Sequence, residues 1–151
     1  SFFREVATEA LEREPQQIGG VGKIVELDES CLVKFKHHRG RRMAKQVWVF
    51  GAVERHDKTK FFACIVERRD KDTLIPLIRE NIAPGSIIIS DGWASYSEIG
   101  SLPEGYQHQV VNHSKFFRDP DTGAHTNTIE GAWMHLLLLL LFFLLSLLYL
   151  L

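Results

Sequence analysis

The chain has 151 residues, of which 45% are hydrophobic and 25% are charged, so it is long enough for one ordinary globular domain and is not a disordered chain. Its formal net charge of -1 excludes a global basic field that would attract nucleic acid, so any such binding must come from a local patch. Cys31 and Cys64 form no CxxC pair, which argues against a zinc knuckle or a disulfide framework and favours a reducing intracellular compartment.

The first twenty residues are expected to form an N-terminal helix and linker. Residues 2–14 predict an amphipathic helix, because apolar side chains share one helical face and acids and arginines lie opposite. The apolar positions are Phe3, Val6, Ala7, Ala10 and Leu11. Pro15 and the pair Gly19–Gly20 end this helix. The chain lacks a start Met and a basic-then-apolar leader, so we expect Ser1 to be the edge of a fragment and not of a secreted precursor.

Residues 23–33 alternate as a strand, with Asp28 in its middle on the more polar face. A carboxylate in mid-strand is disfavoured by propensity and is costly to bury without a partner. Metal coordination would explain why this cost is tolerated. The alternative interpretation is a solvent-facing acid on a half-exposed sheet, which suits either Asp28 or Glu29 taken alone.

A cationic segment without Asp or Glu follows this strand. Its basic residues are Lys34, Lys36, Arg39, Arg41, Arg42 and Lys45. One interpretation is a solvated hairpin tip. The other is a nucleic-acid-binding loop beside the acids, where it would neutralise phosphates of a DNA or RNA strand.

The next elements predict an antiparallel meander followed by a helix. Residues 46–54 and 59–67 are two strands joined by a polar hairpin connection, and together with residues 23–33 they make three antiparallel strands. Residues 70–82 predict a helix with an apolar stripe, capped at its start by Asp70 or Asp72 and ended by Pro84–Gly85.

A short buried strand over residues 86–90 delivers Asp91 at its carboxyl end. Because the strand follows a helical crossover, it should lie parallel to a strand already in the sheet. Open α/β sheets place ligand-binding groups at the carboxyl ends of such strands. The alternative is that Asp91–Gly92 is merely a turn. Residues 93–99 then predict a short helix, and residues 107–112 a fifth strand.

Five sequence motifs, in this order, resemble the catalytic domain of DDE transposases, and above all the Merlin type with its bacterial ISXO2-like relatives. The motifs lie in residues 25–29, 49–55, 78–86, 90–93, and 111–114 with 125–133. The resemblance covers roughly residues 22–133, and ordered motifs are more specific than an acid triplet alone. We therefore take residues 21–135 as the expected catalytic domain.

The resemblance implies an α/β, RNase H-like fold: a five-stranded mixed sheet, with the meander plus parallel strands, flanked by helices. It assigns Asp28, Asp91 and Glu130 as the catalytic and metal-binding acids. Asn127 lies in the last motif and is the alternative to Glu130 as third member. Carboxylates from separate elements can hold two Mg²⁺ or Mn²⁺ ions for in-line phosphodiester displacement.

The resemblance also implies partners and a location. DNA, as transposon ends and target, would be the substrate, and a homo-oligomer would form the synaptic complex. The protein would act in the nucleus of a eukaryote or the cytoplasm of a bacterium. His113 and His125 are auxiliary candidates for orienting DNA or ligands, although histidines in polar loops are more often incidental.

The C-terminal end departs from the family pattern. The family usually carries a basic residue seven positions beyond the glutamate, and this chain has Leu137 there. Residues 136–151 are a leucine-rich tail, 16 residues long, which is shorter than the roughly 20 needed to span a bilayer. Two alternatives to an active transposase stay open: a catalytically inactive DNA- or protein-binding remnant, and a protein tethered to a membrane by this tail.

Overall fold

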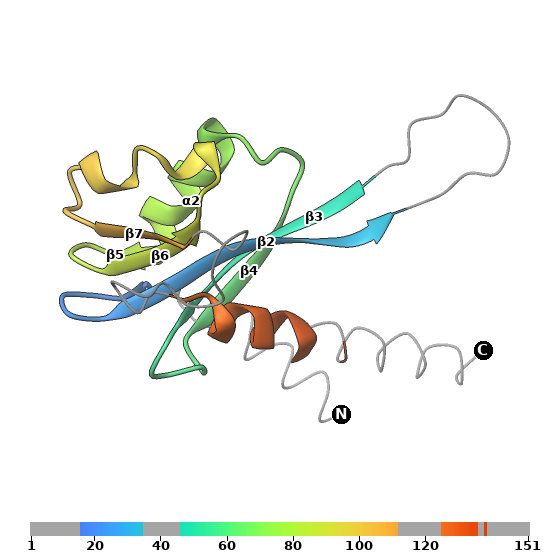
Figure 1. Cartoon of the computed structure of the whole chain (residues 1–151), viewed down its shortest axis with the longest axis horizontal. Helices are drawn as coiled ribbons and strands as arrows, with labels where there is room; N and C mark the ends of the chain where they lie inside the picture. Colours follow the sequence, from blue (N-terminus) through green and yellow to red (C-terminus); the bar gives the residue numbers. More distant parts are fainter. Residues whose placement is uncertain (1–15, 35–45, 112–124, 136–137, 139–151) are drawn as a thin grey trace, which may run out of the picture.

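The computed structural model describes residues 16–34, 46–111, 125–135 and 138, and its centre is a five-stranded mixed sheet (Figure 1). The strands are β2 (Ile24–Lys34), β3 (Gln46–Glu54), β4 (Phe61–Val66), β6 (Ile87–Asp91) and β7 (Gln107–Val111). Their order across the sheet is β4-β3-β2-β6-β7. The β2, β3 and β4 strands are an antiparallel meander, while β6 runs parallel to β2 and β7 parallel to β6. This is the predicted α/β architecture, and it is consistent with an RNase H-like fold.

The helix α2 (Lys71–Asn81) connects β4 to β6 and covers one face of the sheet (Figure 1). Asp70 is its N-cap, since its Oδ1 atom accepts a hydrogen bond from the Thr73 amide at 3.0 Å. The predicted helix was slightly too long. Ile82 has an extended backbone and begins β5 (Ile82–Ala83), which pairs in parallel with β1 (Ile18–Gly19).

This two-residue pairing requires Gly19. Its φ of 84° lies in the left-handed region, and a Cβ atom there would stand 2.4 Å from the Ser86 hydroxyl. The Ser86 hydroxyl also accepts a hydrogen bond from the Gly20 amide at 2.8 Å. Strands this short carry no periodicity, which is why the sequence predicted only a loop here.

The prediction of one short helix over residues 93–99 was wrong. Two 3-10 turns occupy this region, Ala94–Tyr96 and Ile99–Ser101. Serines and a glycine interrupt the segment, and such residues favour turns over continuous helix. Tyr96 nevertheless points into the main core and is 1% exposed.

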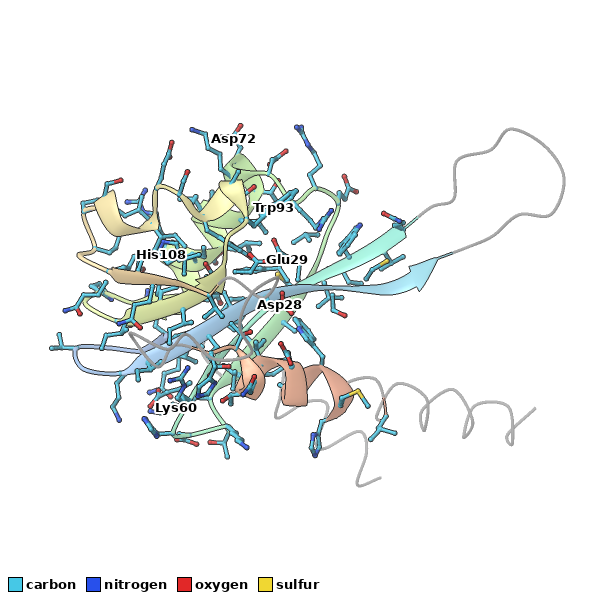
Figure 2. All side chains as sticks on the ribbon, viewed as in Figure 1. Asp28, Glu29, Lys60, Asp72, Trp93 and His108 are labelled. Carbon is cyan, nitrogen blue, oxygen red and sulfur yellow. The ribbon has the colours of Figure 1, made fainter. Side chains whose placement is uncertain are left out.

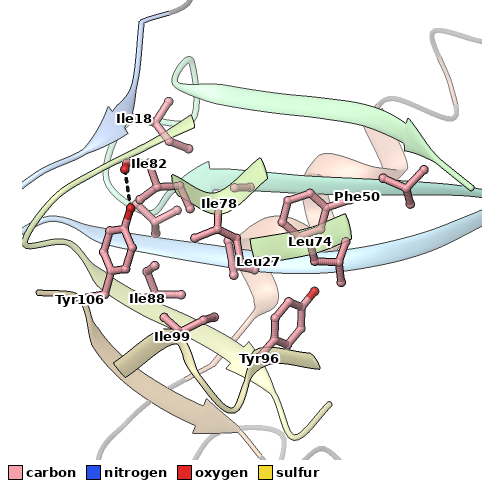
Figure 3. Close-up of a cluster of buried hydrophobic side chains, with 13 residues drawn as sticks. Ile18, Leu27, Phe50, Leu74, Ile78, Ile82, Ile88, Tyr96, Ile99 and Tyr106 are labelled. Atoms are coloured by element: carbon pink, nitrogen blue, oxygen red, sulfur yellow. Dashed lines mark hydrogen bonds between the residues drawn. The ribbon is translucent and has the colours of Figure 1, made fainter. Parts of the chain in front are cut away.

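The main core lies between the sheet and α2 (Figure 3). Leu27 and Phe50 from the sheet pack with Leu74 and Ile78 from α2, and all four are fully buried or nearly so. The Tyr106 hydroxyl closes one end of this layer by donating to the Ile82 carbonyl at 2.8 Å. Apolar burial on this scale is the dominant stabilising contribution to the fold.

A second helix, residues 127–135, covers the opposite face of the sheet (Figure 1). The apolar contact on this face is small: Ile129 and Trp133 pack on Val49 and Val53. The residues predicted as the N-terminal helix lie outside the described residues, as does the tail apart from Leu138. Within the described segments no helix combines the length and the hydropathy required to cross a bilayer.

Candidate functional site

Asp28 and Asp91 lie on neighbouring parallel strands where β6 ends. Glu26 is the register partner of Ile89, and the same offset continued by two residues sets Asp28 level with Asp91. Register partners in parallel strands project from the same face. Both carboxylates therefore belong to the face that carries residues 127–135.

The Asp28 carboxylate is half-buried between β2 and the C-terminal helix (Figure 2). Its Oδ2 atom accepts a hydrogen bond from the Trp133 indole N–H at 3.0 Å. Burial raises the pKa of Asp28 from its ordinary 3.8 to about 6, against the lowering effect of the Trp133 hydrogen bond. The charges of Asp91 and Glu130 raise it further. Asp91 and Glu130 are thus both close enough to Asp28 for their charges to act on it.

Asp91 ends β6, as predicted. Its Oδ1 atom accepts a hydrogen bond from the backbone N–H of Trp93 at 3.0 Å, so the carboxylate also stabilises the turn that follows. The interpretation of Asp91–Gly92 as a turn is therefore correct as local structure.

Glu26 positions the helix that carries Glu130, and the sequence analysis did not identify it as a site residue. Its side chain is fully buried. The Oε2 atom accepts hydrogen bonds from the backbone N–H groups of Thr128 and Ile129 at 2.8 and 2.9 Å. These are free donors at a helix start, where a negative charge is favourable. Glu26 thus caps the helix of residues 127–135 from across the fold.

An arginine neutralises this buried carboxylate. Arg55 Nε donates to Glu26 Oε1 at 2.8 Å, and its Nη2 atom donates to the His125 carbonyl at 2.7 Å. His125 Nδ1 lies 3.6 Å from Glu26 Oε1. The structure therefore places His125, predicted as an auxiliary site residue, in the contact that docks the C-terminal helix.

Glu130 and Asn127, the two candidates for the third position, have different surroundings. Glu130 is exposed, and its Oε1 atom accepts a hydrogen bond from the Thr126 hydroxyl at 3.4 Å. The Asn127 Oδ1 atom is buried and has no hydrogen-bond donor in the described part of the chain. Asn127 lines a cavity of about 450 Å³ between the helix and the β3–β4 hairpin, together with Lys58 and His135. Glu130 is the one whose charge acts on Asp28.

Glu29 is a fourth acid beside the pair, on the opposite side of β2 from Asp28 (Figure 2). Burial raises its pKa from 4.5 to about 7; the Tyr96 hydroxyl beside it lowers the pKa, and the charges of Asp91 and Asp28 raise it. The sequence pattern gave Glu29 only as a strand residue with a solvent-facing alternative. Tyr96, whose hydroxyl lies beside Glu29, is remote from it in sequence.

Most of the predicted basic patch lies outside the described residues, as does His113. Lys34 ends β2, six residues beyond Asp28 and so about 20 Å away along the strand. In the described residues, no group of three or more His, Cys, Asp or Glu side chains is arranged to hold one metal ion.

Comparison with known proteins places this geometry in context. Residues 21–137 match the family described as the ISXO2-like transposase domain. An uncharacterized transposase-like protein of Haemophilus influenzae is 32% identical over 78 residues, which are 52% of this chain and 60% of that protein. The chain thus spans about 60% of the length of that curated relative. No solved structure gives a significant match.

Proposed function

The chain belongs to the ISXO2-like transposase family, and from this premise we propose that it cuts and joins DNA strands by metal-dependent phosphodiester chemistry at Asp28, Asp91 and Glu130. The observation that carries the proposal is the level placement of Asp28 and Asp91 on one face of two parallel strands. The proposed catalytic domain is residues 21–135. Transposon ends and target DNA are its proposed substrates, and a homo-oligomer is its proposed working form.

The three acids have the ligand chemistry of a divalent-cation site, but their described side chains are not gathered around one metal position. Mg²⁺ and Mn²⁺ prefer hard carboxylate oxygens. Burial, and to a smaller extent the charges of Asp91 and Glu130, raises the pKa of Asp28 to about 6, so a negative charge on Asp28 is unfavourable in this place. A cation there would offset that charge. We propose that Asp28 and Asp91 hold the metal and that Glu130 is the third ligand in preference to Asn127.

The chain's own residues orient the acids. The Trp133 indole N–H fixes one oxygen of Asp28, the Glu29 backbone N–H also binds that carboxylate, and the Trp93 amide fixes one oxygen of Asp91. Glu26 sets the position of the helix that bears Glu130. Divalent ions held by Asp28, Asp91 and Glu130 would supply activation of water or of a 3′-hydroxyl and stabilisation of the leaving oxygen. The attacking oxygen bonds to phosphorus as the P–O3′ bond breaks.

The test is nicking of supercoiled plasmid DNA that carries the sequences flanking the coding segment, with Mg²⁺ or Mn²⁺. We expect Asp91→Asn to reduce nicking at least 100-fold, because it removes a metal ligand and half of the acid pair. Asp72→Asn is the matched control, since Asp72 is an exposed acid in the first turn of α2. Equal nicking by wild type and Asp91→Asn would overturn the assignment.

The runner-up is an inactive DNA- or protein-binding remnant, which Leu137 favours because it replaces the family's basic residue. It predicts DNA or protein binding without Mn²⁺ binding. Isothermal titration of Mn²⁺ into wild type and Asp28→Asn distinguishes the two functions. Heat that is present in the wild type and absent in the variant supports the strand transferase.

A further inference from the structure

A cation–π stack lies beside Glu29 on the α2 side of the sheet, at the edge where Asp91 ends β6. The Arg69 guanidinium carbon stands 3.6 Å from the ring centroid of Trp48 and 5.1 Å from that of Trp93. Trp48 belongs to β3, Arg69 to the connection between β4 and α2, and Trp93 to the turn after Asp91. Three separate segments therefore meet in one arginine–indole stack.

The backbone holds this stack in place. The Trp93 indole N–H donates to the Arg69 carbonyl at 3.0 Å, and the Ser95 hydroxyl donates to the same carbonyl at 2.8 Å. The Trp93 backbone N–H donates to Asp91, so the backbone that carries the indole is fixed to a proposed metal ligand two residues away. Figure 2 shows Trp93 on the same side of β2 as Glu29.

Two groups of the stack are available to a ligand: the exposed part of the Trp93 ring and the Arg69 guanidinium. Trp93 is 43% exposed although its N–H group is satisfied, so part of its ring faces solvent. Across the described segments, no hydrogen-bond acceptor or ion-pair partner contacts the Arg69 guanidinium, which has only the two ring contacts and the electrostatic influence of Glu29. A guanidinium has five N–H donors in a geometry that suits phosphate. The position thus combines an open aromatic surface with a free cation.

An apolar surface extends the ring. Val110 of β7 is 48% exposed, and its Cγ1 atom would lie 3.8 Å from a Cβ atom placed on Gly92. Gly92 lies between Asp91 and Trp93 in the chain, so this apolar surface adjoins the turn that follows Asp91. A planar aromatic ligand that carries a phosphate could stack on the Trp93 ring and bind the Arg69 guanidinium through its phosphate at the same time.

We propose that Trp93 and Arg69 form a stacking platform for one unpaired nucleotide next to the scissile phosphate, with the base on the Trp93 ring and its phosphate on the Arg69 guanidinium. The inference rests on the proposed function, because it places the reacting phosphate at Asp28 and Asp91. Stacking on an indole tolerates any base, since every base has a π face. The platform selects single-stranded or extruded nucleotides over paired ones.

Two conservative variants distinguish a nucleotide-binding platform from a stack that only stabilises the fold. Trp93→Phe keeps an aromatic face but loses the bond to the Arg69 carbonyl, which Ser95 retains. Ser95→Ala removes a bond to the same carbonyl and leaves both rings. A structural role predicts that both variants behave like Trp93→Ala, whereas the platform predicts that both bind nearly as the wild type does.

The experiment measures fluorescence anisotropy of a labelled dT10 strand, and of the same backbone without bases, in EDTA with the full chain. Binding in EDTA is independent of cleavage, so the plasmid-nicking assay alone decides the proposed function. We expect Trp93→Ala to weaken dT10 binding about 10-fold and to leave the abasic strand unaffected. Arg69→Gln should weaken both strands and lower the salt dependence of binding by about one phosphate contact. Ile65→Ala, at an exposed apolar position on β4, is the control.

A second readout does not rely on affinity. A dT10 strand with one 5-bromodeoxyuridine, irradiated in complex with the wild-type chain, should cross-link to the peptide that contains Trp93. Equal dT10 binding by wild type and Trp93→Ala would overturn the platform, as would failure of the wild type to bind either strand. A cross-link confined to Trp48 or Trp133 would also overturn it.

Discussion

The two faces of the sheet are held by different kinds of contact. Under α2 the layer is apolar and continuous, with Leu27, Phe50, Leu74 and Ile78 all excluded from solvent (Figure 3). Under residues 127–135 the apolar cluster is small, and polar contacts provide the other interactions that hold this helix on the sheet. Glu26 binds the start of that helix, and Asp28 binds its Trp133.

The difference separates the face that secures the fold from the face that positions the acids. Apolar burial is non-directional and tolerates repacking. A carboxylate that accepts two backbone hydrogen bonds fixes both distance and direction. The polar face therefore determines where Glu130 stands relative to Asp28. Substitutions on this face should alter activity by more than their effect on stability would explain.

The largest expected effect comes from breaking the polar face at Glu26. We expect Glu26→Ala to lower the free energy of unfolding by about 4 kcal/mol, because it leaves the half-buried Arg55 without its carboxylate and two helix N–H groups without an acceptor. Urea denaturation measures this loss. Glu26→Gln keeps an oxygen for the helix and should lose about half as much. Undiminished Mn²⁺ binding in folded Glu26→Ala protein would show that Glu26 does not position the third acid.

Substitutions in the apolar core under α2 should lower the free energy of unfolding without lowering the nicking activity of the folded protein. Leu74→Ala removes a fully buried side chain from α2 and is expected to cost about 3 kcal/mol by urea denaturation. Nicking per folded molecule should match that of the wild type, because Leu74 lies in the core under α2, on the opposite face of the sheet from Asp28. A large fall in that specific activity, with the fold intact, would mean that the two faces are coupled more tightly than their contacts indicate.

The same contrast explains what the sequence could and could not predict. The strands, α2 and the placement of Asp28 and Asp91 follow from local periodicity and from strand ends, so they were predictable. Glu26 was missed, because its burial is decided by helix N–H groups more than 100 residues away. The β1–β5 pair was missed because two-residue strands have no period. No pattern in one sequence encodes which distant donors meet a carboxylate.

A pH titration sharpens the comparison further. The pKa of Asp28 is about 6 in the folded chain and near 3.8 when unfolded, so the unfolded chain loses this proton first as pH rises. The free energy of unfolding should therefore fall by about 2 kcal/mol between pH 4 and 6 through Asp28 alone. Asp28→Asn should flatten that part of the curve in metal-free buffer. An identical slope in wild type and variant would contradict the raised pKa.

Added Mn²⁺ should act in the opposite direction. A cation binds the deprotonated carboxylates, so its stabilising effect should be larger at pH 7.5 than at pH 5. Thermal melting of wild type and Asp91→Asn at both pH values measures this difference. A shift of equal size in Asp91→Asn would place the ion elsewhere.

The smallest expected effect on stability is that of substituting Gly51, which packs against the Trp133 ring. Gly51 is the register partner of Asp28, and a Cβ atom on it would stand 2.6 Å from Cη2 of Trp133. Gly51→Ala should therefore displace the indole whose N–H holds Asp28. We expect a loss of about 2 kcal/mol by urea denaturation, because the indole and strand must shift to admit the methyl group.

Trp133→Phe provides the matched background, since phenylalanine lacks the indole ring atoms that collide with a Cβ at position 51. The cost of Gly51→Ala should be about 1 kcal/mol smaller there, and the residual cost comes from the Phe62 carbonyl at 3.1 Å. Simple additivity of the two substitutions would mean that Trp133 is free to move away from Gly51. The polar face would then be adaptable, and the position of Asp28 would not depend on the indole that contacts it.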